Sequence, residues 1–149
     1  MRKLLASAVL GAALALSGLA RATSPFDAAV AAYDRADYDR ARMLWEEALS
    51  QGDWEAARNL GTIYRRGLGV PADPGRAATY YRGAAEHGVV GAEVNLAEMY
   101  FAGAGVTRDI AEGKRLLKDA AAHGSAPAQY RLKQVEDAEK QGKPPPPLN

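Results

Sequence analysis

The sequence predicts an all-α fold: a short α/α solenoid of antiparallel helix hairpins, with about seven helices in a chain of 149 residues. Three observations predict it. The chain contains an internal repeat of 36 residues. Its apolar residues recur at the spacing of one helix face, and helix start and stop signals return at the same point of each repeat. Such a repeat is the sequence signature of stacked supersecondary units.

The repeat is visible without gaps. Residues 57–92 and 93–128 match at a constant offset, and the register extends back over a leading unit of about residues 25–56. We therefore expect one repeat domain over residues 23–141. The clearest matching pairs are Asn59/Asn95, Leu60/Leu96, Tyr64/Tyr100, Gly67/Gly103, Asp73/Asp109, His87/His123 and Gly88/Gly124.

Each unit is predicted to hold two helices. The first ends at Gly67, a residue free to adopt the left-handed conformation, and Val70 of the following loop is expected to plug into the core. Asp73 and Pro74 then supply an N-cap carboxylate and a proline at the first helical position. Small residues let the helices approach closely, and we assign the repeated tyrosines to the core: Tyr64, Tyr80, Tyr81 and Tyr100.

The two ends of the repeat domain also have signals. Ser24 and Pro25 start the first helix, and a capping helix over residues 126–141 carries a polar outer face. Residues 142–149 include four consecutive prolines, so they are predicted to form a flexible, disordered extension of polyproline type.

Residues 1–22 have the pattern of a secretory signal peptide: a basic start, an apolar run and an A-x-A site, with cleavage after Ala22. An uncleaved membrane anchor is the alternative. After cleavage, removal of three basic residues leaves 16 basic and 18 acidic residues. The mature chain is thus mildly acidic, which argues against nucleic-acid binding. We expect a periplasmic or secreted protein with no stable membrane insertion, monomeric by itself.

No catalytic constellation is evident. The chain has no cysteine, which excludes disulfides and thiolate chemistry. Its two histidines, His87 and His123, occupy one repeat position beside a helix-ending glycine, where a structural role is expected. The Gly-x-Gly loops lack the Gly-Lys-Ser/Thr of a phosphate loop. We therefore expect no catalytic residue, cofactor or metal site, and no enzymatic activity.

The residues from Ala56 to Ala92 carry the pattern A-x-x-x-L-G-x-x-Y-x-x-G-x-G-V-x-x-D without a defect, followed by the alanines and glycine of a second helix. This pattern resembles the Sel-like repeats, relatives of the tetratricopeptide repeat. The next unit departs at Ala97, Gly113 and Leu117, and the leading hairpin resembles an ordinary tetratricopeptide hairpin. The resemblance implies a right-handed superhelix that serves as an adaptor or scaffold, often exported in bacteria.

By analogy with related solenoids, the first helix of each pair is expected to line a concave binding surface. Phe101 stands out, because its counterpart in the preceding unit is Arg65, and exposed aromatics beside arginines resemble interface anchors. The alternative is that these are ordinary surface residues. The candidate protein-binding residues are Glu55, Arg58, Thr62, Arg65, Arg66, Val94, Glu98, Phe101 and Tyr130.

These features predict an exported scaffold or adaptor that binds a protein or peptide partner in the bacterial envelope. Two alternatives remain open. One is a cell-wall or β-lactam-related activity, which rests only on the resemblance to cysteine-rich relatives. The other is a structural subunit of a larger envelope complex.

Overall fold

The computed structural model describes residues 24–147, which form seven α-helices and no strand. The predicted all-α repeat fold is therefore confirmed. The predicted signal peptide, residues 1–22, lies outside the described residues. The helices are α1 (Pro25–Asp34), α2 (Tyr38–Ser50), α3 (Trp54–Arg66), α4 (Pro74–Glu86), α5 (Val90–Ala102), α6 (Ile110–Ala122) and α7 (Ala126–Lys140).

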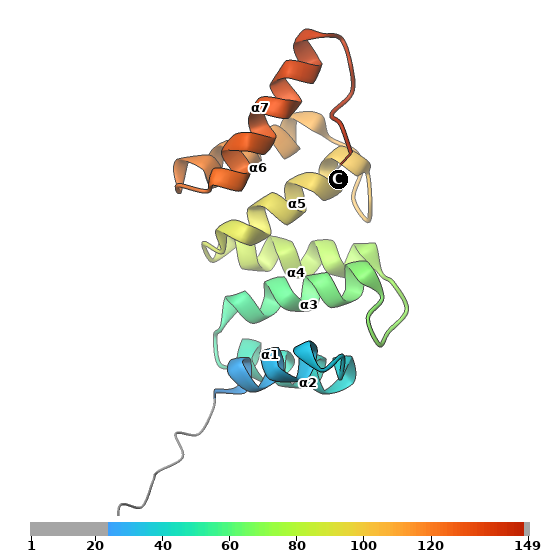
Figure 1. The fold of residues 1–149 in the computed structure, drawn as a ribbon, viewed down its shortest axis with the longest axis vertical. Helices are drawn as coiled ribbons and strands as arrows, with labels where there is room; N and C mark the ends of the chain where they lie inside the picture. Colours follow the sequence, from blue (N-terminus) through green and yellow to red (C-terminus); the bar gives the residue numbers. More distant parts are fainter. Residues whose placement is uncertain (1–23, 148–149) are drawn as a thin grey trace, which may run out of the picture.

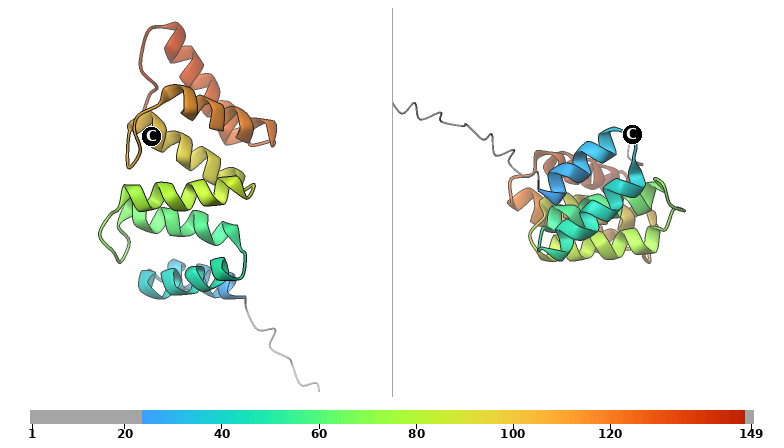
Figure 2. Two further views of the ribbon diagram at one scale, coloured as in Figure 1. Left: turned by 180° about the vertical axis from the view of Figure 1, so that it is seen from behind. Right: turned by 90° about the horizontal axis from the view of Figure 1, so that it is seen from below.

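The helices stack in chain order along the long axis of the molecule (Figure 1), and the same order is seen from behind in Figure 2. Among the described residues, the extensive helix–helix contacts join helices that follow one another in the chain. The bounds of α5 and α6 lie 36 residues after those of α3 and α4. Each hairpin thus buries its apolar faces against its neighbours, which is how a solenoid is stabilised.

Side-chain caps start α4 and α6 where the sequence predicts them. The Asp73 carboxylate accepts the backbone N–H of Arg76, with Pro74 in the first turn of α4. Asp109 does the same for Glu112 at the start of α6, at 3.0 Å. Arg115 donates two hydrogen bonds to the Glu112 carboxylate, and this contact lowers the pKa of Glu112 below its ordinary value.

The long loop inside each complete hairpin is built the same way twice. Gly67 and Gly103 end α3 and α5 with φ angles of 66° and 67°, the left-handed region that glycine adopts without strain. The N–H of Asp73 then donates to the Tyr64 carbonyl at 2.8 Å, closing the loop. As predicted, Val70 turns inward, and it is half-buried against apolar core residues.

The core runs the length of the stack in two clusters that share Leu49, Val70 and Tyr80 at their border. Many of its fully buried residues are alanines, which let neighbouring helix axes come close. Tyr64 is buried and stacks on half-buried Tyr80, and the Arg76 guanidinium lies 4.1 Å from the centre of the Tyr64 ring. The tyrosines thus fill the gaps that small residues leave.

Each complete hairpin seats one aromatic ring against a glycine, but from opposite helices. In the first, Gly61 of α3 faces Tyr81 of α4, and a Cβ on Gly61 would lie 2.6 Å from the ring. In the second, Phe101 of α5 provides the ring and Gly113 of α6 the space. Ala97 and Leu117 occupy the positions of Gly61 and Tyr81, so the second hairpin lacks the first ring–glycine pair. Phe101 and Gly113 supply a ring and a glycine in its place, and the four departures therefore compensate one another.

Candidate functional site

The first helices of the hairpins, together with α7, share one face of the stack, which we call the odd-helix face (α1, α3, α5 and α7). Two hollows open on it. The N-terminal hollow lies between α1 and α3 and is lined by Phe26, Val30, Tyr33, Trp45, Arg58, Asn59 and Thr62. The C-terminal hollow, of about 370 Å³, is lined by Arg65, Glu98, Met99, Phe101, Ala102, Ala104, Arg131 and Pro145–Pro147.

Three predicted residues lie at the N-terminal hollow or beside it. Arg58 is half-buried and donates from Nε to the Glu55 carboxylate at 2.8 Å. The Thr62 hydroxyl lies 3.1 Å from the hydroxyl of Tyr81, so it supplies the polar partner that a buried tyrosine needs. These contacts fix the side chains of Arg58 and Thr62 before any ligand arrives.

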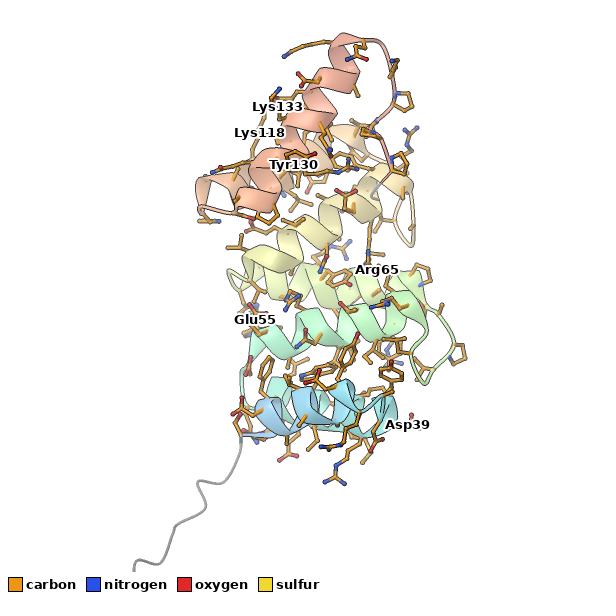
Figure 3. The ribbon with its side chains drawn as sticks, viewed as in Figure 1. Asp39, Glu55, Arg65, Lys118, Tyr130 and Lys133 are labelled. Carbon is orange, nitrogen blue, oxygen red and sulfur yellow. The ribbon has the colours of Figure 1, made fainter. Side chains whose placement is uncertain are left out.

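The remaining surface candidates are spread along the same face. Arg65 is exposed and lines the C-terminal hollow, whereas Arg66 reaches the Tyr33 hydroxyl at 3.5 Å. Figure 3 shows Glu55 and Arg65 at opposite ends of α3 and Tyr130 on α7, where Tyr130 is 68% exposed. Val94 is half-buried and packs against the core. The structure thus brings the candidates onto one face but not into one cluster.

The prediction that Phe101 is an exposed anchor is wrong. Phe101 is only 6% exposed, because its ring fills the space over Gly113 and packs in the core. Arg65, its counterpart in the preceding hairpin, can remain exposed because Tyr81 fills the interior there. Glu98 is also buried rather than free on the surface.

Glu98 is buried with a partner that the sequence analysis missed. Arg131 of α7, 4% exposed, donates from Nε and Nη2 to the two carboxylate oxygens of Glu98 at 2.6 and 2.8 Å. This bidentate geometry is the strongest arrangement of an arginine–carboxylate ion pair. A signal was present in the sequence, since Arg131 stands one repeat after Asn95 and replaces the asparagine found there and at Asn59.

The described part of the proline-rich tail lies against the rest of the protein. After α7 the backbone turns at Gly142, and the tail runs back toward the end of α5 (Figure 1). Pro145 and Pro146 are half-buried at the C-terminal hollow, and the Pro146 carbonyl accepts a hydrogen bond from Arg131 Nη2 at 2.7 Å. The polyproline segment is non-helical, as its composition requires, but it is seated on the protein.

The two histidines make different local contacts. His87 stacks on Trp54, with ring centroids 3.5 Å apart, and its Nδ1 lies 2.8 Å from the Gly83 carbonyl. His123 lies 3.7 Å from Glu93. Within residues 24–147, no three His, Asp or Glu side chains gather where they could hold a metal ion. None of the described helices has the length and apolar character needed to cross a membrane.

Comparison with known proteins places this geometry among repeat proteins. The model of the Sel1 repeat matches residues 32–53, 54–89 and 90–125, more than half of the chain. A protective antigen of uropathogenic Escherichia coli strains, which displays an SLR fold, is similar to the chain with a TM-score of 0.70 and 30% identity. The similarity covers 83% of this chain and 27% of that one. No curated protein matches the chain significantly.

Two further solved structures are similar. A Sel1 repeat protein from Oxalobacter formigenes has a TM-score of 0.67 and 27% identity over 70% of this chain and 43% of its own. Cysteine rich protein B from Helicobacter pylori shares the fold, with a TM-score of 0.58 and 24% identity over 60% of this chain and 68% of its own. The chain therefore spans less than half the length of the first two structures.

Sel1 repeat proteins generally mediate protein–protein interaction, and their fold is typically a scaffold without enzymatic activity. The repeat positions, the hairpin geometry and the family model agree over most of the described residues. The chain belongs to the Sel1 repeat family.

Proposed function

We propose that the chain is an exported adaptor of the bacterial envelope that holds a partner protein or peptide on its odd-helix face. The pattern of residues 1–22 supports export, and the family supports a protein partner. A solenoid suits this role because its stacked hairpins present an extended surface without a dedicated active site.

One observation carries the proposal: the odd-helix face has two preformed hollows, and it also exposes an arginine and a tyrosine, side chains of the types enriched at interfaces. Arg65 stands at the edge of the C-terminal hollow, and Tyr130 is the most exposed large hydrophobic side chain among the described residues. A tyrosine and an arginine can supply contact area and charge-assisted hydrogen bonds to a partner.

The test is capture of proteins from envelope extract by the immobilised chain, followed by identification of the retained proteins. The informative variant is Arg65→Glu/Tyr130→Ala, which changes the odd-helix face without touching the core. The matched control is Arg82→Glu/Lys118→Ala, which changes exposed residues of α4 and α6. Both variants should keep the circular dichroism spectrum of the unchanged chain.

We expect the first variant to lose a partner that the control retains. Retention of the same proteins by both variants would show that the odd-helix face is not the binding surface. If the chain elutes from the extract only within a large assembly and is unstable alone, the structural-subunit alternative is correct instead. The β-lactam-related alternative has no support in this chain beyond its fold, and the chain contains no cysteine.

A further inference from the structure

We propose that the surface at the C-terminal hollow binds an extended, proline-rich segment, and that the chain's own tail, which forms one wall of the hollow, is an intramolecular ligand that a partner segment must displace. This inference rests on the proposed function and names the class of partner for the C-terminal half of the odd-helix face.

The first observation is the apolar surface beside the tail. The hollow has an apolar floor of Met99 and Phe101, both nearly fully buried, and the tail prolines form part of its lining. Proline has no backbone N–H, so a proline run can lie on an apolar surface without burying an unpaired donor. The fixed φ angle of proline also reduces the conformational entropy that the extended segment loses on binding.

The second observation is the donor that meets the tail. A polyproline segment still has carbonyl groups to satisfy, and Arg131 Nη2 donates to the carbonyl of Pro146 at 2.7 Å. The Arg131 side chain is fixed in position by two hydrogen bonds to Glu98 and by a third to the Gln134 side chain at 3.3 Å. The guanidinium group is therefore immobilised with one N–H aimed at the hollow, and binding requires little side-chain ordering.

The third observation is the length of the connection. Only Gln141, Gly142 and Lys143 separate the end of α7 from the proline run, and Gly142 makes the turn with a φ of 67°. A tether this short holds the tail near the hollow at an effective concentration on the order of 1 mM. A separate segment with a Kd on the order of 0.1 mM would consequently be weakened by about tenfold in the intact chain.

Fluorescence anisotropy tests the proposal directly. The probe is a labelled peptide with the sequence of residues 143–149, KPPPPLN. It is titrated with the chain comprising residues 23–149 and with a variant that ends at Gly142. We expect the shortened chain to bind the peptide about tenfold more tightly than the intact chain. Replacing all four tail prolines with serine in the intact chain should raise its affinity for the proline peptide in the same way. The corresponding serine peptide should bind the shortened chain at least tenfold more weakly than the proline peptide.

A matched pair of substitutions locates the site in the shortened chain. Ala102 and Ala122 are both exposed last residues of a helix, but only Ala102 lines the hollow. Ala102→Trp should block the peptide, whereas Ala122→Trp should leave its affinity unchanged. The amide resonances of Ala102 and Ala104 should shift when the tail is removed and return when the peptide is added.

Equal affinity of the intact and shortened chains would overturn the proposal, as would binding that does not depend on the prolines or on Ala102→Trp. The absence of any peptide binding, with unchanged amide resonances on truncation, would also overturn it. If the shortened chain keeps an Arg65-dependent envelope partner but ignores the peptide, this inference fails while the proposed adaptor function stands. If the shortened chain binds the peptide but retains no envelope partner, the peptide site is supported and the proposed adaptor function fails.

Discussion

The packing of Tyr81 against Gly61 makes a quantitative prediction for Gly61→Ala. The new Cβ would lie 2.6, 2.7 and 3.0 Å from three ring atoms, whereas ordinary contacts begin at 3.4 Å. The ring would have to move by roughly 0.8 Å to restore normal van der Waals distances. Tyr81 is fully buried, and its hydroxyl is held by Thr62 on the same helix as Gly61, so that movement is opposed on both sides.

Overpacking of this kind costs about 1–3 kcal/mol of unfolding free energy. A glycine-to-alanine change inside a helix also gains up to about 1 kcal/mol from backbone entropy and helix propensity. The matched control is Gly83→Ala in α4, where the new Cβ would come no closer than 3.4 Å to Trp54. Because both variants share the helix gain, we expect Gly61→Ala to be less stable than Gly83→Ala by about 1–3 kcal/mol.

Urea denaturation followed by circular dichroism measures this difference. A further variant, Gly61→Ala/Tyr81→Leu, reproduces the Ala97 and Leu117 pair of the next hairpin. Removing the ring relieves the overlap, so the double substitution should cost less than the sum of the two single ones by about 0.5–3 kcal/mol. Equal stability of Gly61→Ala and Gly83→Ala, or strict additivity in the double variant, would refute the ring-on-glycine interpretation.

Three further predictions follow from the described contacts. Arg131→Met leaves the buried Glu98 carboxylate without its partner and should lower the unfolding free energy by about 3–5 kcal/mol, whereas Arg131→Met/Glu98→Leu should recover most of that loss. A cost below about 1 kcal/mol for the single substitution in urea denaturation would contradict burial of this pair. His87→Ala removes a stacked ring pair and should cost about 0.5–1.5 kcal/mol and change tryptophan fluorescence. His123→Ala, at the same repeat position without that stack, should leave tryptophan fluorescence unchanged, and an equal fluorescence change in the two variants would argue against stacking. The lowered pKa of Glu112 stabilises the fold fully above its ordinary value of 4.5, and this contribution is lost as pH falls through the lower folded-state pKa. Thermal melts between pH 6 and pH 3 should therefore show a smaller acid-induced drop for Glu112→Gln than for the unchanged chain, and an identical drop would exclude the contribution.

The sequence was sufficient to predict the repeating architecture. Helix starts at Asp73 and Asp109, helix ends at Gly67 and Gly103, and the inward turn of Val70 all depend on short-range chemistry that a single repeat contains. A constant offset of 36 residues then implies that the same unit is stacked again. Neither inference needs knowledge of which side chains meet across the interior.

The binding face was predicted less well, because burial depends on the opposite helix. Phe101 occupies a surface position by repeat register, yet Gly113 on α6 leaves the space that draws its ring inside. In the repeat register Phe101 and Gly113 are two separate departures, but in the structure they compensate each other. Arg131 was missed for the same reason, since its partner Glu98 lies on a different helix 33 residues away.

The sequence by itself thus determined the helices, their caps and the order in which they stack, because these follow from local propensity and periodicity. Only the tertiary structure decided which of the repeat's irregular residues face solvent, since a side chain is buried or exposed according to the space its neighbours leave. The tertiary structure also decided where the proline-rich tail lies. Composition predicts that four prolines are extended, but the donor at Arg131 and the apolar floor of the hollow give that extended segment a place to bind.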